Sequence, residues 1–115
     1  MSCDKCNNLN YSRVLHKAIK RYGITPQMDV CIEELAELIK ALVKYKRVCR
    51  ELYKEDSPDV NAAIEAICEE YVDVSIMLDQ LLIMFPEIEL REREIRDAKI
   101  ARLAGRLFTI GHETA

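Results

Sequence analysis

Two long segments of this chain carry apolar residues at alternating steps of three and four, the spacing that keeps side chains on one face of an α-helix. The first stripe comprises Met28, Cys31, Leu35, Leu38, Leu42, Tyr45, Cys49 and Leu52, with Ile32, Ile39 and Val43 widening it on one side. The second comprises Ile64, Ile67, Tyr71, Val74, Leu78, Leu81 and Phe85. Neither segment alternates as a strand would, so the chain is constrained to pack long helices through these stripes.

Breaks in the periodicity place the first two helices. A first helix is expected over residues 11–22, because apolar residues recur there at helical steps and Gly23 is a natural helix stop. Thr25 followed by Pro26 then forms a cap and first-turn pair, since the missing N–H of proline costs nothing at that position. The second helix should begin there and be long.

Prolines also bound the third helix. Asp56, Ser57 and Pro58 again read as a cap followed by proline, and Pro86 cannot continue the helical hydrogen bonding. A fourth, highly charged helix is expected over residues 87–108.

Composition agrees with an all-α, four-helix bundle-like domain. Half of the residues are apolar and 32% are charged, while only three glycines and three prolines interrupt the chain. We expect one helical domain over residues 10–110, a flexible tail over 1–9 and a short tail over 111–115. A domain of this length has a thin core, so a homodimer or homotetramer is expected.

Charge and hydropathy exclude some partners. The formal net charge of −3 gives no global basic field for nucleic acid. No secretory leader follows Met1 and no apolar run approaches the roughly 18 residues that cross a bilayer. These features predict a cytoplasmic protein without membrane or nucleic-acid partners.

The five cysteines do not suggest a disulfide framework, because their number is odd and no secretory signal accompanies them. Cys31, Cys49 and Cys68 occupy positions that a helix would bury. Cys3 and Cys6 form one C-x-x-C, but a zinc site needs two further ligands and no second pair exists. A tail without metal is the favoured interpretation.

Adjacent acidic residues interrupt both apolar segments, as EELAE from Glu33 to Glu37 and as EEYVD from Glu69 to Asp73. A residue advances about 100° around a helix, so Glu34 lies on the shoulder of the stripe and Glu37 about 60° further round. The two motifs superpose at an offset of 36 residues, which gives Glu70 and Asp73 the same two angular positions. The first glutamate of each motif should point partly away.

If the two helices pack through their stripes, these four carboxylates meet. Two unit charges about 4 Å apart repel by about 4 kcal/mol at an effective dielectric near 20, so such a cluster takes up protons or recruits cations. Oxygen ligands select hard ions, and carboxylates with waters are typical of Mg²⁺, for which Mn²⁺ is a possible substitute. The alternative is an ordinary solvated acidic face. A di-iron site would need E-x-x-H pairs, and neither His16 nor His112 completes one.

The stretches IEELAELIKAL and CEEYVDVSIMLDQL resemble the E-E-x-x-E and E-x-x-D signature of the MazG-like all-α nucleoside triphosphate pyrophosphohydrolases. The resemblance covers residues 27–107. It departs from the family in the long spacing between Glu37 and Glu70, which suggests an extended second helix or an inserted turn over residues 46–58. It implies an all-α pyrophosphohydrolase fold that hydrolyses a nucleoside triphosphate to the monophosphate and pyrophosphate.

The resemblance also implies roles for particular residues. The family's metal ligands carry over onto Glu34, Glu37, Glu70 and Asp73, where Mg²⁺ would neutralise the triphosphate and activate a water. Glu33 is a candidate to accept the proton of that water, the alternative being an ion pair with Lys40.

Three further residues are candidates for holding the substrate. Lys99 and Arg102 share one face of the fourth helix with Arg106. The resemblance implies a phosphate-binding cation on the last helix, which matches Lys99. The alternative to a phosphate-binding role is an ordinary solvated face. Gln27, on the same shoulder as Glu34, contacts the nucleotide or is a surface glutamine. A non-catalytic helical interaction or regulatory module remains the alternative function.

Overall fold

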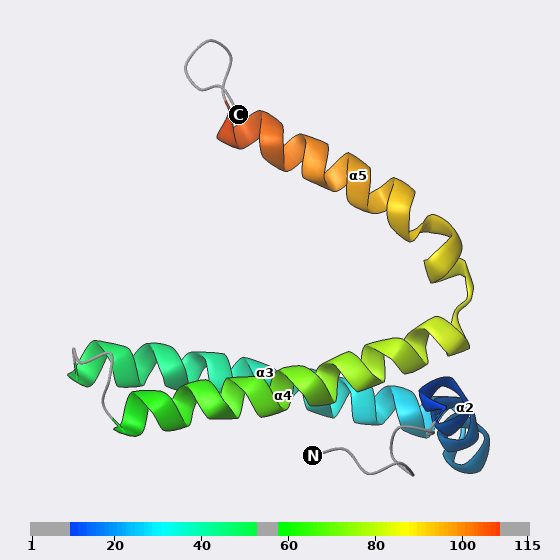
Figure 1. Ribbon diagram of the computed structural model, residues 1–115, viewed down its shortest axis with the longest axis horizontal. Helices are drawn as coiled ribbons and strands as arrows, with labels where there is room; N and C mark the ends of the chain where they lie inside the picture. The colour runs from blue at the N-terminus through cyan, green and yellow to red at the C-terminus, as the bar shows by residue number, and fades with distance from the viewer. Residues whose placement is uncertain (1–9, 53–57, 109–115) are drawn as a thin grey trace. The chain divides into compact units, whose positions relative to one another are not determined.

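The computed structural model describes residues 10–52 and 58–108, and every regular element in these ranges is an α-helix (Figure 1). The helices are α2 (Tyr11–Tyr22), α3 (Ile24–Leu52), α4 (Pro58–Met84) and α5 (Glu87–Leu107). The predicted all-α class with four helices is confirmed for these residues. The expected tails, the Cys3 and Cys6 pair and the Asp56 and Ser57 cap lie outside the described residues.

Gly23 closes one helix and opens the next. Its N–H donates to the carbonyl of Ile19 at 2.8 Å, and its own carbonyl accepts from the N–H of Gln27 at 3.2 Å. The φ of 98° at this residue is one that a side chain would strain, which explains the glycine. Because Gly23 already starts the hydrogen bonding, α3 begins at Ile24, before the predicted cap at Thr25.

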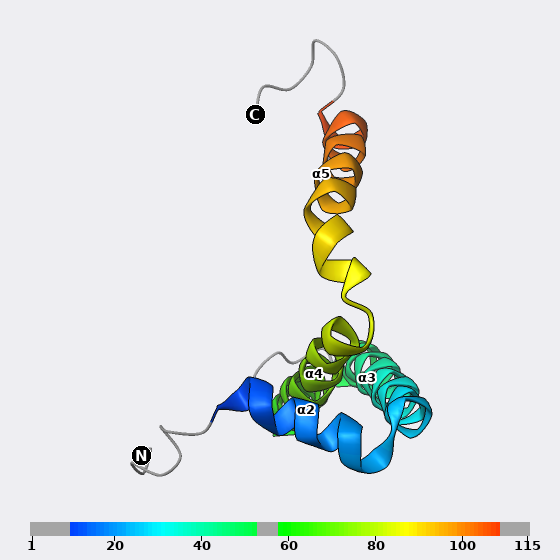
Figure 2. The same cartoon turned by 90° about the vertical axis from the view of Figure 1, so that its right-hand side faces the viewer.

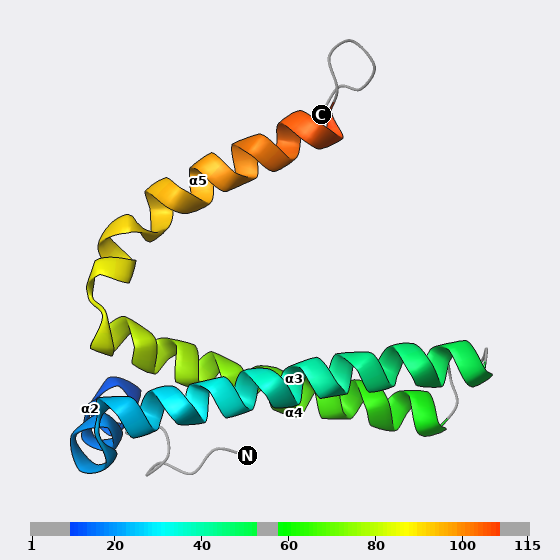
Figure 3. The same ribbon diagram turned by 180° about the vertical axis from the view of Figure 1, so that it is seen from behind.

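The chain divides into two compact units, Met1–Met84 and Phe85–Ala115. In the first unit, α3 and α4 run side by side in opposite directions over most of their length (Figures 1 and 3). Helix α2 lies across this hairpin near the start of α3 and the end of α4 (Figure 2). The extension of α3 to Leu52 matches the extended second helix that the long spacing between the acidic motifs suggests.

A seam of buried and half-buried residues, spaced by three or four, joins α3 to α4. From α3 it contains Gln27, Cys31, Glu34, Leu38, Ala41, Tyr45 and Val48. From α4 it contains Val60, Ala63, Ile67, Glu70, Val74, Met77 and Gln80. Removing the apolar members from water stabilises the hairpin by roughly 25 cal/mol per Å² of apolar surface.

The seam is rotated from the predicted stripes. Burial is wrongly predicted for the stripe residues that are exposed: Leu35, Leu42, Ile64, Tyr71, Leu78 and Phe85, together with Ile32, Ile39 and Val43 at the side of the first stripe. It is also wrongly predicted for Cys68, which is exposed. Each helix carries apolar residues on two adjacent faces, and the hairpin uses the face that contains the small residues Ala41 and Ala63. Small side chains let two helix axes approach closely, so packing selects that face over the more apolar one.

Helix α5 forms the regular part of the second unit and buries none of its residues. Local interactions support it: Arg96 pairs with Glu92, and Arg93 with Asp97 at 4.0 Å, both one turn apart. Glutamates in the first turn and Arg106 in the last turn also complement the helix dipole. Across residues 10–52 and 58–108, no helix combines the length and apolar character needed to cross a bilayer.

Candidate metal centre

Three carboxylates meet at the seam between α3 and α4. Glu34 comes from α3, while Glu70 and Asp73 lie one turn apart on α4, and one oxygen from each lies within 4.8 Å of the others. Glu34 and Glu70 are half-buried and Asp73 is exposed, so the group sits at the edge of the seam with access to solvent. The hairpin thus brings together three of the four predicted metal ligands.

Helical spacing explains why the seam contains glutamates. Glu34 lies between Cys31 and Leu38 in the α3 series, and Glu70 occupies the equivalent position in the α4 series, each at the three- or four-residue step that packing requires. The antiparallel arrangement then sets the middle of one helix against the middle of the other. Glu34 and Glu70 are therefore half-buried members of the contact face, at the edge that solvent reaches.

The cluster changes the protonation of Glu34. Its pKa is raised above the ordinary value of 4.5, first because partial burial disfavours the charged form. The carboxylates of Asp73, Glu70, Glu37 and Glu33 raise this pKa further, in that order of effect. A cation placed among the three carboxylates would offset both contributions.

Glu37 is not one of the three clustered carboxylates. Its Oε1 lies 3.5 Å from the Nζ of Lys40, and both side chains are largely exposed. Lys40 therefore pairs with Glu37 and not with Glu33, its alternative partner. Glu33 and Glu69 are both exposed, whereas Glu34 and Glu70 are half-buried, so the second member of each motif lies deeper in the seam than the first.

Beside the cluster, a groove of about 450 Å³ runs between α3 and α4. Glu37 and Glu70 line it together with the cations Lys40, Lys44 and Arg47. Sequence reasoning missed Lys44 and Arg47 as candidate site residues. Their signal is that Lys40, Lys44 and Arg47 follow one another at steps of four and then three residues, which places all three cations on one face of α3.

Gln27 lies in the seam and is only 8% exposed, so its interpretation as a surface glutamine is wrong. Its Nε2 donates a hydrogen bond to Oε1 of Gln80, which is also buried, at 2.8 Å. Gln80 was not a candidate in the sequence, because its partner is 53 residues away. A role for Gln27 in binding substrate stays a prediction.

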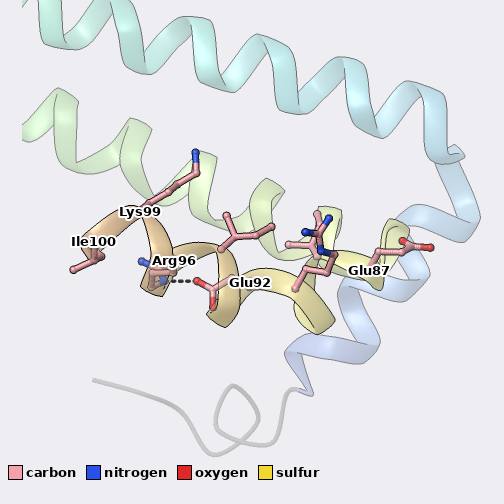
Figure 4. A pocket seen from close by; sticks show the side chains of 8 residues that line it. Glu87, Glu92, Arg96, Lys99 and Ile100 are labelled. Carbon is pink, nitrogen blue, oxygen red and sulfur yellow. Dashed lines mark hydrogen bonds and ion pairs between the residues drawn. The ribbon is translucent and has the colours of Figure 1, made fainter. Parts of the chain in front are cut away.

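On α5, Lys99, Arg102 and Arg106 line one concavity of about 510 Å³, which confirms that they share a face. A second concavity of about 640 Å³ runs along α5 from Glu87 to Ile100 and also includes Lys99. Figure 4 shows Lys99 near one end of this row and Glu87 at the other, with the Arg96–Glu92 pair between them. The phosphate-binding role of Lys99 and Arg102 stays a prediction.

The chain matches no protein-family model, no curated protein and no solved structure. Membership of the MazG-like superfamily therefore stays a prediction. What the geometry provides is a set of three hard oxygen donors from two helices, next to a groove that contains three cations.

Proposed function

We propose that this protein is a Mg²⁺-dependent hydrolase that converts a nucleoside or deoxynucleoside triphosphate to the monophosphate and pyrophosphate, and so removes unwanted nucleotides. One observation carries the proposal: the carboxylates of Glu34, Glu70 and Asp73 converge from two helices. These are residues that the MazG-like resemblance implies as metal ligands.

The donor set suits the proposed ion. Three carboxylate oxygens are hard ligands that favour Mg²⁺, with Mn²⁺ as a substitute, and they leave positions for water and phosphate oxygens. When bound, the ion supplies neutralisation of the triphosphate and a water of lowered pKa. The raised pKa of Glu34 supports the assignment, because crowded carboxylates gain most from a cation.

The other residues have roles in binding and proton transfer. In the reaction, water oxygen bonds to the α-phosphorus, pyrophosphate leaves, and the water's proton passes to a base, for which exposed Glu33 is the candidate. Lys44 and Arg47 are placed in the groove beside Glu70, where they can hold the β and γ phosphates. Lys99 and Arg102 remain alternative phosphate contacts, and Glu37 a further ligand.

Association into a homodimer or homotetramer forms part of the proposal. The exposed fractions of Ile32, Ile39 and Val43 on α3 are 64%, 61% and 56%, and Tyr71 on α4 is 64% exposed. Apolar surface of this extent favours burial between copies. The same surface is the observation that favours the second candidate function, a non-catalytic interaction module.

Pyrophosphate release across canonical and modified nucleoside triphosphates tests the function. With Mg²⁺ present, Glu34→Gln and Asp73→Asn should each lower kcat/KM by about 100-fold or more, because a charge that stabilises the transition state is lost. Asp79→Asn, on the same helix outside the cluster, serves as the matched control and should retain activity. Absence of release with every substrate would favour the interaction module, and unchanged activity in both variants would remove the site assignment.

A further inference from the structure

The buried hydrogen bond between Gln27 and Gln80 is a directional contact in a seam that is otherwise mostly apolar. The Nε2 of Gln27 donates to Oε1 of Gln80 at 2.8 Å, and the Nε2 of Gln80 donates to Sδ of Met77 at 3.6 Å. The two glutamines are only 8% and 4% exposed. Among the described residues, no buried side-chain nitrogen or oxygen lacks a partner, so this network is satisfied as it stands.

The pair is aligned with the carboxylate cluster. Gln27 precedes Glu34 by seven residues on α3, and Gln80 follows Asp73 by seven residues on α4. Two helical turns, about 10 Å, therefore separate Gln27 from Glu34 on α3 and Gln80 from Asp73 on α4. Any axial shift that breaks the glutamine pair moves Glu34 relative to Glu70 and Asp73 by the same amount.

The most buried apolar part of the seam is built from side chains of modest size, which discriminate between axial positions less sharply than a buried polar pair does. Its most buried members on the two helices are small or flexible side chains: Cys31, Ala41, Val60, Ala63, Val74 and Met77. Such residues pack acceptably at several offsets, whereas a buried polar pair is satisfied at one only.

The carboxylates oppose the observed register. Glu34, Glu70 and Asp73 repel one another when ionised, and sliding the helices by one or two turns would separate them. Some contact must offset this repulsion in the absence of a cation. The glutamine pair meets that requirement, because its loss would leave polar groups buried without partners.

We infer that the Gln27–Gln80 hydrogen bond is a register lock: it fixes the axial position of α3 against α4 and thereby keeps the three carboxylates together. Both glutamines are positioning residues. The positioning role is inferred from the hydrogen bond and the packing of the seam. Its consequence for metal binding rests on the proposed function.

Thermal unfolding of three variants separates a register role from simple stabilisation. Gln80→Leu leaves Gln27 without its partner and should lower Tm relative to the native chain. Adding Gln27→Leu removes both polar groups and should restore Tm to near the native value or above it. Asn61→Leu, an exposed amide on α4, is the matched control and should leave Tm nearly unchanged. If the double variant is less stable than the Gln80→Leu single variant, the glutamine pair acts by simple stabilisation and the register role is overturned.

Distance measurement then tests the register directly. Nitroxide labels on non-natural residues at Arg47 and Asp79, both exposed, avoid the five cysteines and report the offset of α3 against α4. Dilution with unlabelled chain removes distances between copies. The native chain and Asn61→Leu should give one narrow distribution, while Gln27→Leu with Gln80→Leu should shift or broaden it by about 5–10 Å, one or two turns. An unchanged distribution in this double variant would overturn the inference.

Binding of Mn²⁺, followed by the loss of its free electron paramagnetic resonance signal, links the register to the site. The double variant should bind Mn²⁺ at least about tenfold more weakly than the native chain, although it is equally stable. Equal affinity would contradict the positioning role. If the native chain binds no Mn²⁺, the metal proposal fails, and the distance measurement still decides the register.

Discussion

The α3–α4 hairpin and helix α5 acquire their candidate functional groups in different ways. In the hairpin, packing brings Glu34 to residues of α4 that lie 36 or more positions later in the chain. In α5, Lys99 and Arg102 share a face through helical periodicity alone. Assembly by packing makes a site sensitive to the core, whereas assembly by periodicity makes it sensitive only to helix formation.

The two regions also differ in what stabilises them. The hairpin has a buried seam with a hydrogen bond across it, while α5 has ion pairs one turn apart and no buried residue. Exposed pairs of that kind contribute about 0.3–0.5 kcal/mol each. Matched substitutions in the two regions should therefore have unequal effects.

The largest expected difference comes from placing a charge on each helix. Ala63→Asp puts a carboxylate at a seam position that is 3% exposed, and should lower the free energy of unfolding by about 3 kcal/mol or more. Ala98→Asp makes the same change at an exposed position of α5 and should cost about 0.7 kcal/mol or less. Urea unfolding followed by circular dichroism gives both values. Similar losses would contradict the expected difference and would indicate that Ala98 is buried in solution.

Magnesium should stabilise the hairpin and not α5. At a Mg²⁺ concentration 100 times the dissociation constant, the free energy of unfolding should rise by about 2.7 kcal/mol, because only the folded chain assembles the carboxylates. Thermal melts with Mg²⁺ and with a chelator measure the shift. Glu34→Gln should remove it and Asp97→Asn on α5 should retain it; an equal Mg²⁺ effect in both variants would rule out the proposed centre.

The two groups of cations offer a sharper comparison, because one lies beside the carboxylates and the other on α5. If the groove holds the triphosphate, Lys44→Gln and Arg47→Gln should each raise KM about tenfold, equivalent to about 1.4 kcal/mol. Lys99→Gln and Arg102→Gln test the contact that the family resemblance implies. Steady-state kinetics decides between them: a larger KM effect on α5 than in the groove would reverse the assignment.

The smallest expected effect concerns pH in the absence of divalent cations. Because the pKa of Glu34 is raised in the folded chain, the folded state holds this proton more tightly than the unfolded state. The contribution of Glu34 to the free energy of unfolding is fully present below pH 4.5, and it is lost as the pH rises through the pKa that Glu34 has in the folded chain. The stability of the native chain relative to Glu34→Gln should therefore fall over that interval. Urea unfolding of both proteins across a pH series measures the difference, and a rising or flat difference would contradict the prediction.

Sequence patterns predicted the elements well and the contact face only in part. Gly23 and Pro86 separate helices as expected, because their backbone constraints act locally. Leu35 and Tyr71 were predicted to be buried but are exposed, since periodicity cannot tell which of two adjacent apolar faces meets another helix. Glu34 and Glu70 were recognised as a pair through the repeated motif, although polar residues are not ordinarily expected inside a seam.

The amino-acid sequence alone predicts the four helices within residues 10–52 and 58–108 and the repeated acidic motif, because helix boundaries and residue spacing depend on neighbouring residues. Packing of α3 against α4 is what brings Glu34 to Glu70 and Asp73, and Gln27 to Gln80. Those contacts depend on the rotation and axial offset of two packed helices. Both quantities depend on side chains that meet across the seam from distant parts of the sequence, which no local pattern contains.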